Sequence, residues 1–160
     1  MPYGTCFYCR EGHFPQCSEI KERLPGGFAE YIVVPEVLVE KGTYLLPSSV
    51  SYDRSTFIEP LACVVRSRRL AGPGPEKTVT IPVNDFWTKE VQILTSYYCG
   101  PPDIQEAIEL LAAGAIDVER MITHRLPLKD IVRGFELVMS GEEAVKVIIE
   151  PHAKEGNSGS

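Results

Sequence analysis

A proline- and glycine-rich segment, AGPGPEK over residues 71–77, most restricts what this chain can fold into. Pro73 and Pro75 each fix φ and lack a backbone N–H group, so the segment continues neither a helix nor a strand. A chain of 160 residues is typically one domain and buries roughly 70% of the surface that its unfolded form exposes. We therefore expect one domain over residues 1–151, with a stiff junction at 71–77 and a disordered, polar tail over 152–160.

The junction also bears on nucleotide binding. A dinucleotide site needs a glycine-rich turn between a strand and a helix, so that backbone N–H groups face the pyrophosphate. The only Gly-x-Gly sequence is Gly72-Pro73-Gly74, which is followed by another proline and by no predicted helix. The sequence therefore predicts no Rossmann domain and no site for a nicotinamide cofactor.

Composition and charge exclude several classes of partner. The net charge of −6, with no basic cluster longer than RSRR at 66–69, argues against a nucleic-acid surface. The sequence contains no run of about 18 apolar residues, so no membrane-spanning helix is expected. The N-terminal residues include cysteines where a secretion signal would have an apolar stretch, so we expect a cytoplasmic protein.

Helix and strand signals recur along the chain. Three segments combine apolar residues at helical spacing with start and stop signals. These predicted helices cover residues 60–71, 102–113 and 128–139, and Ser51 is predicted to cap a turn before the first of them. Apolar or β-branched runs predict strands. They lie at 28–34, 43–47, 78–83, 89–98 and 144–151.

Residues 1–24 form a cysteine-rich lobe. Cys6 and Cys9 make a Cys-x2-Cys pair, Cys17 follows further along, and His13 lies between them. Zinc takes four sulfur or nitrogen ligands in a tetrahedron, and these four side chains have a suitable spacing. Two other interpretations stay open at this point, a metal-free loop in which the thiols are only close together and a catalytic dithiol.

Glu59 is the second candidate for metal binding. It lies in the apolar segment FIEPLACVV, directly before Pro60, so we expect its carboxylate to be partly buried. A buried carboxylate is paired or coordinates a cation. The alternative is that Glu59 stabilises the start of the following helix, where a negative charge is favourable. Cys63 and Cys99, by contrast, are expected to pack as small apolar side chains.

Four stretches, taken in order, resemble the zinc-dependent medium-chain alcohol dehydrogenases, a family that includes sorbitol and threonine dehydrogenases. They are GTCFYCREGHFPQC, GGFAEYIVVP, LPSSVSYDRSTFIEPLACVVR and ITHRLPLKDIVRGFELVMSGEEAVKVIIEP. The resemblance implies an α+β fold, namely part of a GroES-like (chaperonin-10-like) antiparallel β-barrel that carries the three helices. It also implies that Cys6, Cys9 and Cys17 match three of the four cysteines of a structural zinc site, with Tyr3 in the place of the first.

The resemblance further implies the chemistry of the family, which is hydride transfer between an alcohol and NAD(P) with zinc as a Lewis acid. Glu59 matches the acidic residue at the catalytic zinc in the polyol-dehydrogenase branch. The family's cofactor domain would lie at the 71–77 junction, and its catalytic cysteine and histidine-glutamate pair precede the cysteine lobe, where this sequence begins. We therefore expect a truncated catalytic domain that is inactive alone. The alternative is a non-enzymatic zinc-binding or scaffold module that associates with itself or with a complementing chain through exposed barrel edges.

Overall fold

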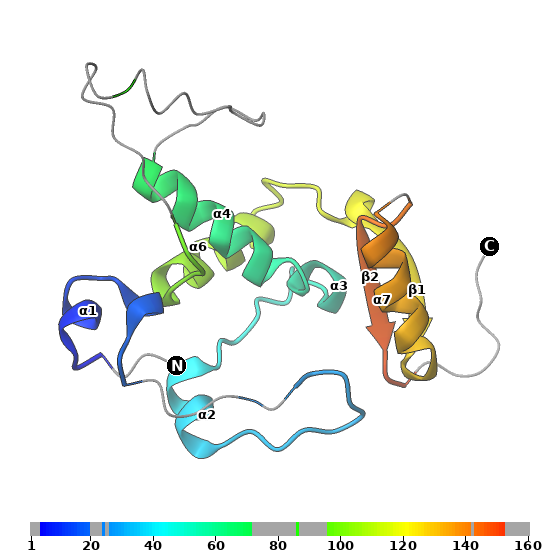
Figure 1. Cartoon of the computed structure of the whole chain (residues 1–160), viewed down its shortest axis with the longest axis horizontal. Coiled ribbons are helices and arrows are strands. Elements are labelled where there is room, and N and C mark those ends of the chain that lie inside the picture. The colour runs from blue at the N-terminus through cyan, green and yellow to red at the C-terminus, as the bar shows by residue number, and fades with distance from the viewer. Residues whose placement is uncertain are drawn as a thin grey trace.

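A computed structural model of the chain describes residues 4–19, 24, 26–71, 86, 96–141 and 143–152. Short helices at the N-terminal end precede the longer helices of the centre and the C-terminal end (Figure 1). In chain order the elements are α1 (Phe7–Arg10), η1 (Phe14–Gln16), α2 (Glu36–Gly42), α3 (Tyr52–Ser55), α4 (Ile58–Ala71), α6 (Pro101–Ala112), η2 (Glu119–Met121), β1 (Ile122–Pro127), η3 (Leu128–Asp130), α7 (Ile131–Ser140) and β2 (Lys146–Glu150). The described chain is therefore mixed helix and strand, in agreement with the α+β prediction.

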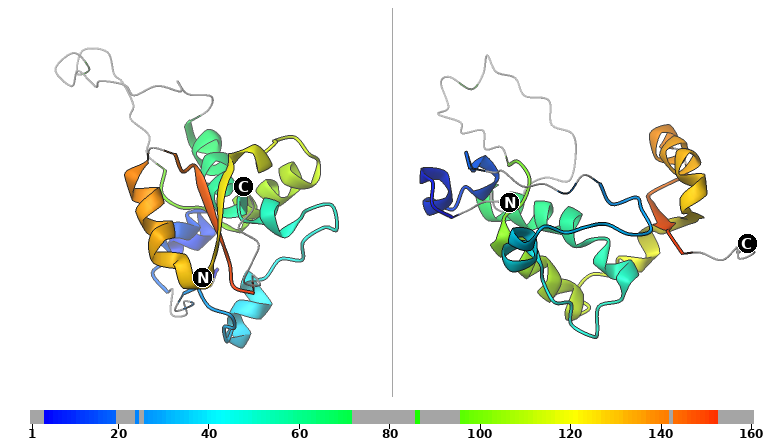
Figure 2. Two further views of the ribbon diagram at one scale, coloured as in Figure 1. Left: turned by 90° about the vertical axis from the view of Figure 1, so that its right-hand side faces the viewer. Right: turned by 90° about the horizontal axis from the view of Figure 1, so that it is seen from below.

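The helices α4 and α6 pack against each other at the centre of the structure (Figures 1 and 2). Between them lies a core of small buried residues, Ala62, Cys99 and Ala107. Small side chains at a helix contact allow the two backbones to approach closely. A second core cluster extends from the C-terminal part of α6 to the segment before α4. Its buried members are Val50, Phe57, Leu111 and Val118.

The ends of α6 follow the signals of the sequence. Pro101 occupies the first helical position, and the Asp103 carboxylate accepts a hydrogen bond from the Gly100 N–H group at 2.8 Å. After the other end, Gly114 has a φ of +66°, a left-handed conformation that glycine adopts without a Cβ clash. The prediction of a helix over 102–113 is confirmed to within one residue.

The other two predicted helices and the predicted cap are also confirmed. The helix predicted over 60–71 is α4, which begins slightly earlier, at Ile58. The helix predicted over 128–139 is divided into η3 and α7. Ser51 Oγ accepts a hydrogen bond from the Arg54 N–H group at 3.3 Å and so caps α3.

The C-terminal unit consists of β1, α7 and β2, with the strands parallel and α7 in the connection between them. Gly134 of α7 lies against the strands, because a Cβ at this position would be 3.2 Å from Ile149 Cδ1. Gly141 ends α7 with a φ of +65°. The strand predicted over 144–151 is confirmed as β2, whereas β1 was not among the predicted strands.

Polar contacts join the C-terminal unit to the helical part. Arg125 of β1 pairs with Asp53 of α3 and, at 2.9 Å, with Glu150 of β2. The hydrogen bonds from Arg125 hold the pKa of the Asp53 carboxyl below its ordinary value. Lys146 Nζ donates a hydrogen bond to the Thr56 carbonyl oxygen at 2.9 Å. These contacts attach the strand pair to the segment immediately before α4.

Two of the predicted strands are wrong. Residues 28–34 and 43–47 form no strand, and the side chains of Tyr31 and Val33 are 85% and 89% exposed. A β-branched composition favours a strand only where a neighbouring strand can satisfy the backbone N–H and C=O groups. The described residues hold one sheet, of two parallel strands, and no antiparallel barrel. The barrel expected from the resemblance is therefore not confirmed.

Several predictions fall outside the described residues. They concern Tyr3, the junction beyond residue 71, the strand at 78–83, residues 89–95 of another predicted strand, and the tail beyond His152. Among the described helices, none combines the length and the apolar character that a membrane crossing requires.

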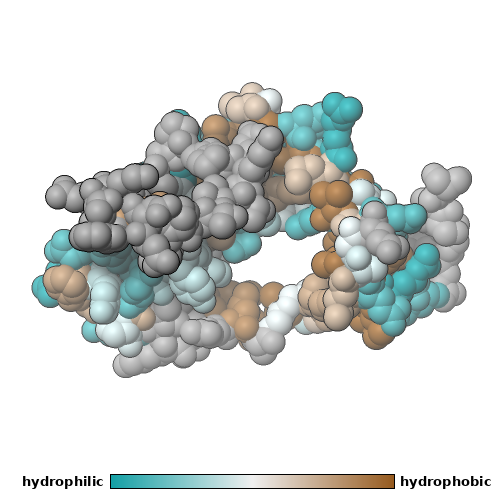
Figure 3. Space-filling model, turned by 45° about the horizontal axis from the view of Figure 1, so that its top comes forward, coloured by the Kyte–Doolittle hydropathy of each residue, from teal (hydrophilic) through white to brown (hydrophobic). Residues whose placement is uncertain are grey.

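Large apolar side chains are exposed on much of the described surface. Figure 3 shows apolar residues on both sides of an opening in the middle of the molecule. The most exposed of these side chains in the described part of the chain are Tyr31, Val33, Leu45, Tyr52 and Met139.

Candidate metal centre

The segment 4–17 folds into two short turns that bring three cysteines together. Cys6 is the N-cap of α1, and Cys9 lies within this helix. Gly12, with a φ of +78°, allows the chain to reverse direction, and Cys17 is the C-cap of the following η1. We call Cys6, Cys9 and Cys17 the knuckle cluster.

The knuckle cluster has the dimensions of a zinc site. Its three sulfur atoms all lie within 4.8 Å of one another. Cys6 Sγ and Cys17 Sγ are 3.9 Å apart, and two thiolates with zinc–sulfur bonds of about 2.3 Å in a tetrahedron are about 3.8 Å apart. Cys9 and Cys17 are buried, and all three cysteines are free thiols. The donor set therefore fits one zinc ion with three of its four ligands.

The two thiols of the Cys-x2-Cys pair differ in acidity. Hydrogen bonding from the backbone of Cys9 lowers the pKa of the Cys6 thiol to about 6. Burial raises the pKa of the Cys9 thiol to about 11, so without metal this thiol is protonated at neutral pH. Zinc binds thiolates, so its binding would release the Cys9 proton and would weaken as the pH falls.

The structure does not bring His13 to the knuckle cluster. His13 is exposed, and it is absent from the group of side chains whose ligand atoms converge. Three thiols leave one position of a tetrahedral site for a further ligand. His13 as that fourth ligand stays a prediction, and Tyr3, the other position considered, is outside the described residues.

Glu59 lies in the first turn of α4, and its side chain is exposed. The expectation that its carboxylate is partly buried is therefore wrong. The reason is that α4 begins at Ile58, before Pro60, and this start leaves Glu59 on the water-facing side of the first turn. A negative charge at a helix N-terminus is favourable, as the alternative interpretation of Glu59 requires.

Cys63 and Cys99 pack against the small core between α4 and α6, as expected. They also lie beside Glu59, and the ligand atoms of Glu59, Cys63 and Cys99 are all within 4.8 Å of one another. We call these three residues the helix cluster. The spacing of Glu59 and Cys63, one helical turn apart, is a sequence signal for half of the cluster. Nothing in the sequence pairs Cys99 with them, because only the packing of α4 against α6 brings it there.

Both thiols of the helix cluster are weakly acidic. Burial raises the pKa of Cys99 to about 12, and the nearby Cys63 thiol contributes to this rise. Burial and the hydrogen bond to Glu59 raise the pKa of Cys63 above its ordinary value. Without metal, both side chains are therefore neutral thiols at physiological pH.

The knuckle segment packs against the chain just before α6. A Cβ on Gly100 would lie 2.9 Å from Phe14 Cδ2, so glycine is the residue that permits this contact without displacement. Gly100 directly follows Cys99. The two clusters are therefore connected by a close contact between Phe14 and Gly100.

Comparison with known proteins identifies relatives of the chain, although no protein-family model matches it. Galactitol 1-phosphate 5-dehydrogenase of Escherichia coli K12 is 36% identical over 84 residues, which make up 51% of this chain and 23% of that protein. Sorbitol dehydrogenase of Gallus gallus is 37% identical over 82 residues, 51% of this chain and 22% of that protein. D-xylulose reductase of Scheffersomyces stipitis is 31% identical over 101 residues, 58% of this chain and 26% of that protein.

The chain thus spans about a quarter of the length of the curated relatives that it matches. Each alignment covers about half of this chain, and the relatives agree in being named dehydrogenases or reductases. The resemblance drawn from the sequence motifs is confirmed to this extent: over about half of its length, this chain is similar to dehydrogenases and reductases that are named for sugar alcohols and their phosphates.

Proposed function

We propose that this chain is a zinc-stabilised portion of a polyol-dehydrogenase-like catalytic domain, in which Cys6, Cys9 and Cys17 hold a structural zinc ion. The observation that supports it most directly is the convergence of these three thiols within 4.8 Å. When bound, zinc supplies folding energy to a segment that has little core of its own. In residues 4–19, the buried side chains are those of Cys9 and Cys17.

The chemistry of the relatives would be hydride transfer between a sugar alcohol and NAD(P). We propose that this chain does not catalyse that reaction alone. No glycine-rich turn follows a predicted strand, so a pyrophosphate has no cradle of backbone N–H groups. Glu59 is the one residue that matches the family's catalytic centre. In this chain, the Glu59 carboxylate at the start of α4 would serve as a single ligand to zinc.

Metal analysis of the purified protein tests the zinc proposal. The protein is purified under reducing conditions, and its zinc content is compared with that of Cys9→Ser and Tyr8→Phe. Tyr8 is the neighbour of Cys9 and is 44% exposed, so its conservative variant controls for local disturbance. We expect Cys9→Ser to lose one equivalent of zinc and Tyr8→Phe to lose none. Full zinc content in Cys9→Ser would overturn the proposal.

An activity assay tests the second part. The zinc-loaded protein is mixed with NAD or NADP and with sorbitol, galactitol or xylitol, and reduced cofactor is followed by its absorbance. We expect no turnover. Cofactor-dependent oxidation of any of these polyols by the chain alone would contradict the proposed lack of independent activity.

A non-enzymatic module that associates with another chain is the second candidate function. It is favoured by the exposure of Phe28, Tyr31 and Val33, which belong to the segment predicted as a strand. Under this proposal, residues 28–34 and 43–47 become strands of a GroES-like barrel only when strands of a partner chain lie beside them. The mass of the protein in solution, by light scattering, tests it. A monomer at all concentrations, with unchanged circular dichroism, would count against self-association.

We propose the cytoplasm as the compartment, because five cysteines, an odd number with three crowded at one end, suit metal ligation in a reducing environment better than a disulfide framework.

A further inference from the structure

The helix cluster has a composition that the family resemblance does not assign. Glu59 and Cys63 are one turn apart on α4, so their side chains lie on the same face of the helix. Cys63 Sγ donates a hydrogen bond to Glu59 Oε1 at 3.4 Å. Cys99 comes from the segment before α6, and its Sγ lies within 4.8 Å of both other ligand atoms.

The separations suit a tetrahedral metal ion. With a zinc–sulfur bond of about 2.3 Å and a zinc–oxygen bond of about 2.1 Å, tetrahedral angles place the sulfur and oxygen ligands about 3.6 Å apart. The observed separation of Cys63 Sγ and Glu59 Oε1 is 3.4 Å. The metal could therefore bind between these atoms with only small side-chain adjustments.

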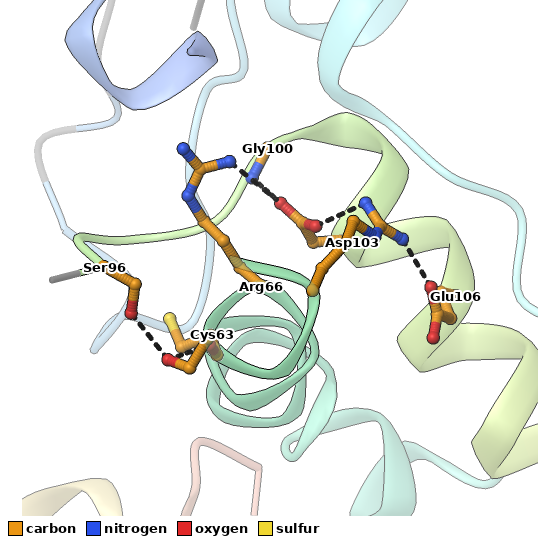
Figure 4. Close-up of polar contacts among 8 residues, drawn as sticks. Cys63, Arg66, Ser96, Gly100, Asp103 and Glu106 are labelled. Atoms are coloured by element: carbon orange, nitrogen blue, oxygen red, sulfur yellow. Dashed lines mark hydrogen bonds and ion pairs between the residues drawn. The ribbon is translucent and has the colours of Figure 1, made fainter. Parts of the chain in front are cut away.

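Ser96 and Gly100, which flank Cys99 in the sequence, make polar contacts that hold this segment in place beside α4 (Figure 4). On one side, Ser96 Oγ and Ser67 Oγ are 2.6 Å apart, and Ser67 Oγ also donates to the Cys63 carbonyl oxygen at 3.0 Å. On the other side, the Gly100 N–H group donates to the Asp103 carboxylate. The position of Cys99 relative to Cys63 is thus fixed without any metal.

Asp103 is itself anchored to α4. Its carboxylate is 2% exposed and pairs with Arg69 Nη1 at 2.7 Å and with Arg66 Nη1 at 3.7 Å. These ion pairs tie the N-terminus of α6 to the same helix that carries Glu59 and Cys63. Ligands held by packed helices and by neighbouring hydrogen bonds form a preorganised site.

The three side chains of the helix cluster differ in their exposure to solvent. Cys99 is 5% exposed, Cys63 is partly buried, and Glu59 is exposed. Two sulfur ligands with one carboxylate leave a fourth position, and the exposed side of Glu59 gives water access to it. Three protein ligands with an open position are the pattern of zinc sites that bind an exchangeable ligand.

We propose that Glu59, Cys63 and Cys99 form a second zinc-binding site, with two thiolates and one carboxylate as ligands and a solvent-accessible fourth position. This site is separate from the knuckle cluster, and its existence does not depend on zinc at Cys6, Cys9 and Cys17. Two thiolates favour zinc over magnesium or calcium, which prefer oxygen ligands.

Metal stoichiometry with variants of each cluster tests this site separately from the knuckle. The full chain is stripped of metal under reducing conditions and titrated with Zn²⁺ alone, or with Co²⁺ as a spectroscopic substitute. We expect two equivalents in the wild type. Cys9→Ser should keep the helix-cluster equivalent, and the double variant Cys63→Ser/Cys99→Ser should keep the knuckle equivalent.

Glu59→Gln provides a milder variant with a matched control. We expect it to weaken Zn²⁺ binding at the helix cluster by about tenfold or more. Tenfold is the smallest typical effect of mutating a residue that only hydrogen-bonds to a metal ligand, and Glu59 would be a ligand itself. Glu106→Gln makes the same chemical change at a glutamate that pairs with Arg69 outside the cluster, and it should leave both affinities unchanged.

A measurement on the unaltered protein guards against variants that fail to fold. Zn²⁺ should protect Cys63, the less buried of the two thiols, from alkylation by iodoacetamide, as read by peptide mass spectrometry. Uptake of a single equivalent that Cys9→Ser abolishes, with Cys63 alkylated equally with and without Zn²⁺, would overturn the proposal. A disulfide between Cys63 and Cys99 that persists in reductant and prevents Zn²⁺ uptake would also overturn it. If the wild type takes up only the helix-cluster equivalent of Zn²⁺, the result would instead count against the proposed structural zinc at the knuckle cluster.

Discussion

The two cysteine clusters differ in what holds their ligands in place. The knuckle cluster lies in short turns whose buried side chains are those of Cys9 and Cys17. The helix cluster lies on α4 and beside α6, where apolar packing, hydrogen bonds and ion pairs fix the backbone. A metal at the first cluster would therefore act as part of the fold, whereas a metal at the second would bind to a surface that is already formed.

Removal of zinc should produce the largest difference between the two regions, because only the knuckle segment should lose its structure. Structural zinc contributes roughly 10–16 kcal/mol in small zinc modules, so residues 4–19 should lose their turns when a chelator removes the metal. The helices α4 and α6 should keep theirs. Hydrogen exchange measured by mass spectrometry reports both regions in one experiment.

The proposed difference between the two clusters is wrong if chelation leaves the hydrogen exchange of residues 4–19 unchanged. It is also wrong if α4 and α6 lose protection from exchange to the same extent as residues 4–19. A chelator-treated sample that is reloaded with zinc serves as the control for irreversible oxidation of the thiols.

Thiol reactivity without metal should differ strongly between Cys6 and the buried cysteines. The pKa of Cys6 is about 6, while those of Cys9 and Cys99 are about 11 and about 12. At pH 7, Cys6 is mostly thiolate and the others are thiols. An acidic thiolate is a weaker nucleophile, which offsets part of the advantage that Cys6 has in thiolate fraction. Alkylation of Cys6 should still be about a hundredfold faster than that of Cys9 and Cys99.

The pH dependence has a definite sign. Alkylation of Cys6 should rise as the pH increases through about 6 and then level off, while Cys9 and Cys99 should stay slow until the pH approaches their own higher pKa values. Site-resolved mass spectrometry after brief iodoacetamide treatment measures each rate. Equal rates at the three positions would show that hydrogen bonding and burial do not control these thiols.

Asp103 should be critical for the helix region and irrelevant to the knuckle. Asp103→Ala removes the partner of Arg66, whose side chain is 9% exposed and whose Nε has no hydrogen-bond partner among the described residues. An uncompensated buried charge costs about 3–5 kcal/mol. We expect a loss of that size in the free energy of unfolding by urea, together with loss of the Zn²⁺ site at the helix cluster.

The matched variant is Glu106→Gln, which removes the negative charge of a partly exposed partner of Arg69 and should cost less than about 1 kcal/mol. Knuckle zinc should be unaffected by either change. A small effect of Asp103→Ala would mean that α4 and α6 are held by apolar packing alone.

The sequence was informative where a local signal decides the structure. Pro102, Asp103 and Gly114 predicted α6, Gly141 predicted the end of α7, and Ser51 predicted a cap, because each of these residues acts on its own backbone neighbourhood. It was misleading at residues 28–34, whose β-branched side chains form a strand only with a partner beside them. β1 was not predicted because its strand conformation depends on pairing with β2.

The same distinction applies to the candidate sites. The knuckle cluster could be read from spacing, because Cys6 and Cys9 share one turn of chain. The helix cluster required tertiary structure, because Cys99 reaches Cys63 only through the packing of α6 on α4. Glu59 was recognised as a candidate for metal binding, but its exposure followed from where α4 begins.

The smallest expected effect concerns the contact that links the two clusters. A methyl group at Gly100 would lie 2.9 Å from Phe14 Cδ2, so Gly100→Ala must displace the Phe14 ring or shift the backbone before α6. Overpacking of this kind costs about 1–3 kcal/mol. Because the Phe14 side chain is only partly buried, we expect the ring to move and the cost to fall at the lower end. Gly114→Ala is a poor control because its φ is positive, whereas Gly27→Ala has open space and a φ that alanine tolerates. If Gly100→Ala weakens Zn²⁺ binding at the helix cluster more than at the knuckle, the backbone around Cys99 has yielded instead, and the helix region is less rigid than its packing indicates.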